Sequence, residues 1–348
     1  MSALAPLAAS QEHRVAAGPS ARNVARELLA ADRLPGLTLA VSVGSDLVCS
    51  EALGWASLDP PRPATTESRL RIASISKALT SVALGLLWQE GSLDLDAEVQ
   101  RYVPSFPRKQ HAITVRQLAG HLSGLPHYAA NDMLNREPYS SVTAALSKFA
   151  GRPLVHAPGE RFAYSSFGWN LLAAVIEGVA GIEYLRFMAD RVFAPLGMAD
   201  TAPDLPGLAG NERADCYVVR TLGDVVDAPA IDNSDAWASA GFLSTAEDLV
   251  RFARGVLDGG LLEPPTVELL FTPMRTRDGA AVPYGLGWEL GSHCGRRVVG
   301  HGGSHVGATA QLLVLPEERI AVALLANANS RSLRAAAARV ARLVLSGM

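Results

Sequence analysis

Strand-like segments gather at the two ends of this 348-residue chain, whereas the middle is dominated by helical patterns and Pro/Gly loops. Near the start, Leu37–Val43 and Asp46–Leu53 are two short apolar runs separated by a turn, which predicts an antiparallel hairpin. Near the end, Gly307–Leu315 and Ile320–Asn327 predict a second hairpin. Both hairpins are too small to be stable alone, so we expect a single antiparallel sheet built from both ends of the chain.

Helical periodicity recurs at five places along the chain. The segments are residues 20–31, 74–90, 168–179, 245–257 and 332–346. The first and the last lie outside the two hairpins in sequence, so they are expected to flank the sheet. The predicted fold class is therefore α+β, an antiparallel sheet flanked by N- and C-terminal helices with a helical lobe beside it.

The same pattern predicts the domain organisation. We expect a flexible tail over residues 1–19, a sheet lobe from residues 20–95 and 236–348, and a helical lobe from residues 96–235. Pockets form preferentially where such lobes meet. A crevice between the two lobes is thus the expected place for a site.

Composition excludes several classes of partner. The net charge is −3, which does not favour nucleic acid or an anionic membrane surface. No apolar run approaches the roughly 18 residues of a membrane helix, so no transmembrane segment is expected. The N-terminal apolar run is too short and broken for a signal peptide, which predicts a cytoplasmic protein. A homo-oligomer is left open.

Neither a metal nor another cofactor is expected. The cysteines Cys49, Cys216 and Cys294 are widely spaced and odd in number, so they indicate buried thiols and no disulfide framework. Zinc at His301 and His305, with a third histidine from elsewhere, is a weak alternative because the chain has no HExxH motif. An α/β-hydrolase triad is also disfavoured, since no GxSxG follows a strand.

The first chemical motif is Ser74-Ile75-Ser76-Lys77, at the start of a strong helical pattern. Residues three apart share a helix face, so Ser74 and Lys77 should be neighbours. Ser74 would lie at the helix N-terminus, where free N–H groups and the helix dipole favour negative charge. A desolvated Lys77 would have a lowered pKa and could accept the serine proton. Alternatively, Ser74 only caps the helix and Lys77 is solvated.

Two further motifs carry polar side chains in suitable places. Tyr164-Ser165-Ser166 lies on a loop before a helix, where a tyrosine close to a lysine can relay a proton. His301-Gly302-Gly303-Ser304 lies between strand signals, where glycine permits close approach of another backbone or a ligand. Taken singly, the first is also typical of a helix cap and the second of a hairpin turn.

Together the three motifs resemble those of the serine β-lactamase and penicillin-binding-protein superfamily, which includes D-alanyl-peptidases and related esterases. That superfamily carries SxxK, then Tyr-x-Asn or Tyr-x-Ser, then Lys-Thr-Gly or a His-x-Gly variant, in this order. The stretches HLSGLP from His121, SAGFLSTAEDLVRFA from Ser239 and YGLGWEL from Tyr284 are similar to the family as well. The likeness spans residues 35–328 and is greatest to the mitochondrial serine β-lactamase-like proteins and their bacterial relatives.

The resemblance implies a β-lactamase/transpeptidase-like fold and a serine hydrolase that forms an acyl-enzyme. Ser74 would be acylated, and Lys77 and Tyr164 would share proton transfer. The backbone N–H groups of Ser74 and Ser304 would form the oxyanion hole. Ser166, with His301, Gly303 and Ser304, would line the part of the site that binds the substrate. The implied partner is a small-molecule or peptide acyl substrate.

Two departures from the usual pattern bear on the substrate. His301 stands where typical β-lactamases carry lysine, and an unperturbed histidine is mostly neutral at pH 7. Ser166 stands where many of them carry asparagine. Esters, amides or peptides are therefore favoured, and β-lactamase activity should be weak. A low-turnover acyl-binding sensor or a self-assembling scaffold on the same fold is the alternative.

Overall fold

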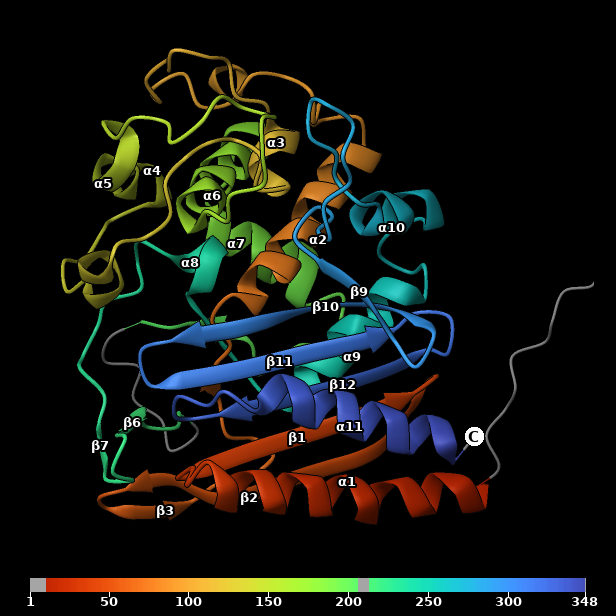
Figure 1. Ribbon diagram of the computed structural model, residues 1–348. Helices are drawn as coiled ribbons and strands as arrows, with labels where there is room; N and C mark the ends of the chain where they lie inside the picture. Colours follow the sequence, from red (N-terminus) through yellow and green to blue (C-terminus); the bar gives the residue numbers. More distant parts are fainter. Residues whose placement is uncertain (1–10, 206–212, 348) are drawn as a thin grey trace, which may run out of the picture.

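The computed structural model describes residues 11–205 and 213–347 and is built around a seven-stranded antiparallel sheet (Figure 1). The strands follow the order β3-β2-β1-β12-β11-β10-β9. Their bounds are β1 Gly36–Val43, β2 Asp46–Leu58, β3 Pro61–Pro63, β9 Glu289–His293, β10 Arg296–His305, β11 Ala308–Leu315 and β12 Ile320–Ala326.

The two ends of the chain meet in the middle of this sheet. β1 pairs with β12 in a register that runs from Leu37 opposite Ala326 to Val43 opposite Ile320, and β12 pairs with β11. The predicted N-terminal and C-terminal hairpins therefore belong to one sheet. The predicted α+β fold class is confirmed.

Each face of the sheet is covered by its own helices (Figure 1). Helices α1 (Gln11–Ala31) and α11 (Leu333–Ser346) pack against one face, and α2 (Ile75–Gln89) and α9 (Ala246–Leu257) pack against the other. Side chains of β12 alternate between the two cores, as a strand buried on both faces requires.

One boundary prediction was wrong. Helix α1 begins at Gln11, so residues 11–19 are helical and do not form a tail, while residues 1–10 of that predicted tail lie outside the described part. Here Pro19 lies inside the helix.

The residues between the two ends form a mainly helical layer next to the α2 face. Its longest helix is α6 (Ser166–Ala180), which packs against α2, α3, α4, α7 and α8. The other helices here and nearby are η1 Val99–Arg101, α3 Val115–Ala119, η2 Ala130–Leu134, α4 Val142–Ala145, α5 Ser147–Ala150, α7 Tyr184–Met188, η3 Ala189–Phe193, α8 Trp237–Ala240 and α10 Pro264–Phe271.

Five very short strands were not anticipated from the sequence. β4 (Leu70–Arg71), β8 (Phe242–Ser244) and β5 (Ala202–Pro203) form a three-stranded sheet in that order, and β6 (Tyr217–Val219) pairs with β7 (Val225–Asp227). β4 leads directly into the turn before α2, so its pairing with β8 fixes where that helix begins.

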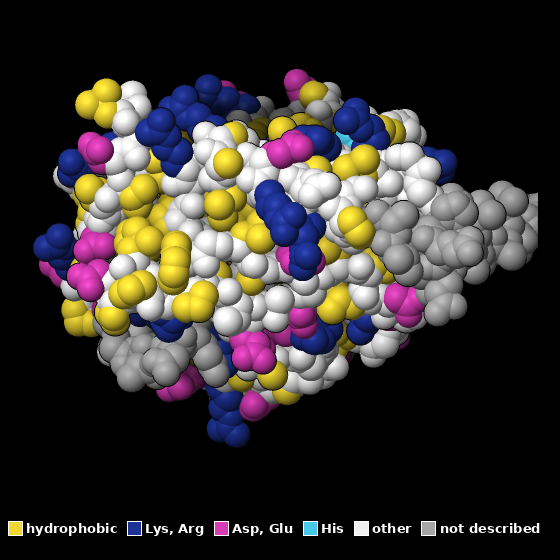
Figure 2. Space-filling view, turned by 90° about the horizontal axis from the view of Figure 1, so that it is seen from below, with side chains coloured by type: hydrophobic (Ala, Val, Ile, Leu, Met, Phe, Trp, Pro, Cys, Tyr) yellow, Lys and Arg dark blue, Asp and Glu magenta, His cyan; other side chains and the backbone are white. Residues whose placement is uncertain are grey.

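The lower surface, viewed along the α1 side, mixes charges of both signs with apolar side chains (Figure 2). The exposed apolar residues of β2 are Leu47, Trp55 and Leu58. Neither sign of charge dominates this face. Within residues 11–205 and 213–347, no helix combines the length and the apolar character needed to cross a bilayer.

Candidate active site

Ser74 lies in a strained turn at the start of α2. The preceding Ala73 has a φ of 47°, a conformation that residues other than glycine rarely adopt. Ser74 occupies the N-cap position, yet its side chain makes no capping hydrogen bond. The alternative reading of Ser74 as a capping side chain therefore does not fit. Ser74 itself is half-buried and lies at the start of a helix whose residues from Ile75 to Leu87 are buried.

Lys77 is completely buried, with 0% of its surface exposed. Its Nζ lies 3.1 Å from Ser74 Oγ, 3.2 Å from Ser166 Oγ and 2.7 Å from the carbonyl oxygen of Ser239. No carboxylate of the described chain forms an ion pair with it. Burial without a counter-charge lowers the pKa of Lys77 well below its usual value.

Tyr164 completes this group from the loop before α6. Lys77 Nζ lies over its ring, 4.9 Å from the ring centroid. Burial raises the pKa of the Tyr164 phenol, and a hydrogen bond with Ser74 offsets only part of that rise. The phenol therefore holds its proton at neutral pH, which suits a proton donor better than a base.

Two histidines hold the backbone of the Tyr164 loop. His121 Nδ1 accepts a hydrogen bond from the N–H of Ser165 (3.1 Å), and His127 Nδ1 accepts one from the N–H of Ser166 (3.2 Å). His121 also packs against Tyr164, with their ring centroids 4.1 Å apart. Neither role was predicted. The sequence offered only the HLSGLP stretch, which is similar to the family but does not indicate which atoms are in contact.

The two serines of this loop have different tasks. Ser165 Oγ accepts a hydrogen bond from the N–H of Gly168 and so caps α6. Ser166 is the first residue of α6, and its hydroxyl lies against Lys77. The expected helix cap is therefore Ser165, and Ser166 is free to face the lysine.

His301 lies on β10 with only 1% of its surface exposed. Its Nε2 accepts a hydrogen bond from the Tyr284 hydroxyl (2.9 Å), and its Nδ1 donates to the carbonyl of Gly302 (2.6 Å). Burial, together with the nearby Lys77, lowers the pKa of His301 to about 3. The ring is thus neutral at pH 7, and both of its nitrogens are occupied by protein groups.

Gly303 lets β10 approach the turn that carries the serine. A Cβ on Gly303 would lie 2.3 Å from the carbonyl oxygen of Ile72, so only glycine fits. Ser304 follows on the same strand and is exposed. The glycine-rich motif is therefore part of a strand and not a turn between strands, and it brings Ser304 close to the start of α2.

The structure thus brings all seven predicted site residues to one region where α2, α6 and β10 meet. Among the described residues there is no group of three or more histidine, cysteine, aspartate or glutamate side chains arranged to hold a metal ion. What the arrangement offers instead is an accessible hydroxyl, a buried amine and a protonated phenol within contact of one another.

Comparison with known proteins agrees with this arrangement. The model of the family described as "Beta-lactamase" matches residues 21–346. The chain belongs to the beta-lactamase family. The predicted superfamily resemblance is thereby confirmed, and with it the assignment to serine β-lactamase-like hydrolases.

Two curated relatives illustrate the breadth of this family. The human serine beta-lactamase-like protein LACTB, mitochondrial, is 31% identical over 82% of this chain and 69% of the relative. Penicillin-binding protein 4* of Bacillus subtilis is 27% identical over 83% of this chain and 67% of the relative. Because the LACTB relative is mitochondrial by name, the cytoplasmic location inferred above stays a prediction.

Solved structures share the fold over nearly the whole chain. The octameric penicillin-binding protein homologue from Pyrococcus abyssi has a TM-score of 0.84 at 25% identity, over 94% of this chain and 77% of that chain. A D-stereospecific amidohydrolase from Streptomyces has a TM-score of 0.79 at 25% identity, over 94% and 99%. A D-amino acid amidase from Ochrobactrum anthropi, at 24% identity and a TM-score of 0.82 over 94% and 99%, supports the fold alone.

Proposed function

We propose that this protein is a serine hydrolase that cleaves esters, amides or peptides through an acyl-enzyme on Ser74. One observation carries the proposal: Lys77 is fully buried without a carboxylate and its amine touches the Ser74 hydroxyl. Burial without a counter-charge lowers the pKa of a lysine amine, so the amine loses its proton more readily and can act as a base.

The hydrogen bonds of Lys77 are consistent with the first step, in which Ser74 attacks the substrate. A neutral amine has two N–H groups and one lone pair, and the Ser239 carbonyl can only accept. With the second N–H on Ser166, the lone pair of Lys77 faces the Ser74 hydroxyl. Lys77 then takes the hydroxyl proton as Ser74 Oγ bonds to the substrate carbonyl carbon.

The remaining steps follow from the other groups. The tetrahedral oxyanion would be held by the backbone N–H groups of Ser74 and Ser304, each worth about 3–4 kcal/mol in comparable hydrolases. Tyr164 would protonate the leaving alcohol or amine as the bond to carbon breaks, and would regain a proton from Lys77. Water would then attack the acyl-enzyme, with the same groups acting in reverse order.

The neutral side chain of His301 favours substrates that carry no carboxylate. A β-lactam antibiotic carries a carboxylate, and a buried histidine with a pKa of about 3 offers it no positive charge. A charge-assisted hydrogen bond contributes about 1.5–3 kcal/mol, or one to two decades of affinity. We therefore expect weak β-lactamase activity at best. Structural likeness to a D-stereospecific amidohydrolase makes D-aminoacyl amides a further substrate class to test.

The test is labelling of the full chain with a fluorophosphonate probe, with and without a chelator, followed by turnover of a substrate panel. The panel contains p-nitrophenyl acetate and butyrate, L- and D-aminoacyl anilides and nitrocefin. Ser74→Ala should abolish labelling and turnover, whereas Ser76→Ala, one residue before Lys77 but with a buried hydroxyl, should keep labelling.

Three results would count against the proposal in different ways. Substantial turnover by Ser74→Ala would refute the nucleophile, and faster turnover of nitrocefin than of the short esters would refute the substrate preference. Stable labelling without turnover of any substrate would favour the acyl-binding sensor. The octameric homologue motivates a parallel measurement of mass in solution, since self-association of this chain is still a prediction.

A further inference from the structure

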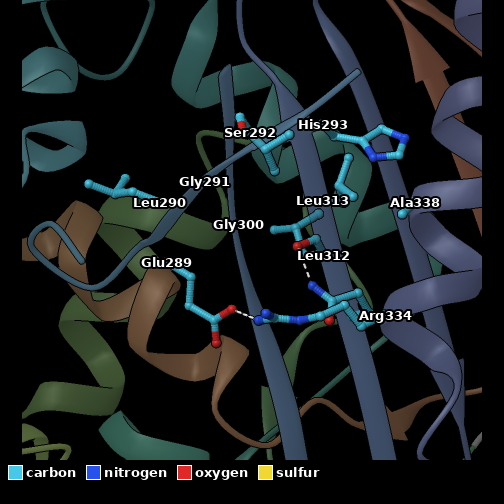
Figure 3. Close-up of a pocket in the computed structure, with 12 residues that line it drawn as sticks. Glu289, Leu290, Gly291, Ser292, His293, Gly300, Leu312, Leu313, Arg334 and Ala338 are labelled. Atoms are coloured by element: carbon cyan, nitrogen blue, oxygen red, sulfur yellow. Dashed lines mark hydrogen bonds and ion pairs between the residues drawn. The ribbon is translucent and has the colours of Figure 1, made fainter. Parts of the chain in front are cut away.

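A pocket of about 240 Å³ lies on the face of the sheet opposite Ser74 (Figure 3). Helices α1 and α11 cover the central strands of that face and leave β9 and β10 beside α11 uncovered. The pocket is lined by Glu289, Leu290, Gly291, Ser292, His293, Val298, Gly300, Gln311, Leu312, Leu313, Arg334 and Ala338. None of these residues belongs to the candidate active site.

Part of the floor of this β9–β10 pocket is open because Gly291 has no side chain, whereas a Cβ at Gly300 would lie 2.2 Å from the carbonyl oxygen of Leu312. Gly300 pairs with Glu289 on one side and with Leu313 on the other, and Gly291 pairs with Val298, so these residues share one face of the sheet. A Cβ added to Gly291 would meet no atom within 4 Å. The result is an apolar depression bounded by aliphatic side chains.

Both charges at the mouth of the pocket are within reach of solvent. Arg334 of α11 forms an ion pair with Glu289 of β9, and their side chains are 68% and 32% exposed. Figure 3 shows this pair at one end of the pocket, with the aliphatic residues and His293 beyond it. His293 Nε2 is buried without a hydrogen-bond partner in the described structure. The pocket therefore combines an apolar body with one cation, one anion and an unused polar atom.

We propose that this pocket binds an aliphatic α-amino acid in its zwitterionic form. The α-carboxylate would pair with Arg334, the α-ammonium with Glu289, and the side chain would fill the depression over Gly291. A zwitterion replaces one exposed ion pair by two, whereas a simple carboxylate would leave Glu289 without its partner and a simple amine would do the same to Arg334. Because exposed ion pairs contribute little to stability, the exchange costs the protein little.

A ligand in the β9–β10 pocket would change the contacts of β10. Glu289 Oε1 lies 3.4 Å from the N–H of Gly302 and 3.8 Å from His301 Nδ1. A ligand that draws this carboxylate outward alters the contacts of the strand that carries Gly303 and Ser304. The binding site itself does not depend on the proposed hydrolase function, so the two can fail separately.

Isothermal titration of the full chain with leucine, 4-methylpentanoate and 3-methylbutylamine tests the charge requirement. The two analogues share the branched apolar chain and each lacks one charge. We expect leucine to bind in the millimolar range and each analogue to bind about two- to fivefold more weakly, the effect of one lost contact between partly exposed charges.

Two variants and one matched control locate the binding. Gly291→Leu fills the floor and should remove most leucine binding, whereas Arg334→Gln removes the cation and should weaken binding about two- to fivefold. Arg339→Gln loses another exposed ion pair of α11, to Glu27, and should bind as the wild type does. Arg334 is largely exposed, so its variant tests the idea even if Gly291→Leu fails to fold. Absence of leucine binding to the wild type, equal binding of all three ligands, or undiminished binding by Arg334→Gln overturns the proposal.

Discussion

Lys77 and Lys148 are both withdrawn from solvent, but the chain surrounds them differently. Lys148 pairs with the buried carboxylate of Asp235 and donates to the carbonyl of Asp132, 2.9 Å away. Among the described residues, the amine of Lys77 lies against two hydroxyls, one carbonyl and the Tyr164 ring, and none of these groups carries charge. A counter-ion offsets the desolvation of the amine in the first case, whereas in the second the uncompensated burial lowers the pKa of Lys77.

This difference separates a structural lysine from a reactive one better than burial does. Lys148 together with Asp235 ties α5 to the segment before α8, a task that any well-placed cation can perform. The Lys77 site disfavours a permanent charge and places the amine against the hydroxyl of the half-buried Ser74. The predictions below test this contrast.

The largest effect is expected for exchange of lysine by arginine at the two positions. Lys77→Arg keeps the positive charge but cannot lose a proton, so turnover of the best ester should fall by about 10²–10⁴, the usual contribution of a general base. Lys148→Arg should retain turnover within a few-fold. Rates normalised to correctly folded protein check both, and an active Lys77→Arg enzyme would contradict the base role.

Removal of the two amines should affect stability in opposite ways. Lys148→Met leaves Asp235 buried without a partner and should lower the free energy of unfolding by about 3–5 kcal/mol. Lys77→Met removes a buried amine that has no counter-ion, so its stability should match or exceed that of the wild type. Urea denaturation of both variants measures the contrast, which fails if Lys77→Met is the less stable protein.

The sheet could be predicted from the sequence because each strand shows its apolar pattern within a few consecutive residues. Alternating and continuous apolar runs fix strands such as β1 and β12 within a few residues, and the start of α2 is marked by the change of periodicity at Ser74. Errors occurred where tertiary pairing decides the boundary. β2 continues to Leu58 instead of Leu53 because it is held by the edge strand β3.

The sequence predicted which residues form the site and which of them are in contact within one helix, but not the contacts between distant segments. Ser74 and Lys77 are three residues apart on one helix, so their contact follows from helix geometry. The acceptor of Lys77 on Ser239 and the bond from Tyr284 to His301 join segments that no local pattern relates. His301 itself was expected to line the substrate site, and its engagement with Tyr284 could not be read from the sequence.

An intermediate effect is expected from charge at position 301. His301→Lys introduces an amine beside the substrate site, so turnover of nitrocefin relative to p-nitrophenyl butyrate should rise by about one to two decades. His301→Gln changes the side chain without adding charge and is the matched control. An unchanged ratio in His301→Lys would mean that this position does not face a substrate carboxylate.

The smallest effect concerns acid stability, and it extends the contrast between neutral and ion-paired surroundings. The pKa of His301 is about 3 in the folded chain and about 6.5 when unfolded, so between these values only the unfolded chain binds the proton. The stabilisation is complete above about pH 6.5 and is lost as the pH falls towards 3, by about 1.4 kcal/mol per pH unit within that window.

His301→Gln removes the titrating ring, so from pH 5.5 to 4.5 its free energy of unfolding should fall by about 1.4 kcal/mol less than that of the wild type. Urea denaturation at both pH values measures this difference, with His111→Gln at an exposed position as control. If the free energy of unfolding falls equally in the wild type and in His301→Gln, the ring takes up its proton equally in the folded and unfolded chain. The neutral state assigned to His301 would then be wrong.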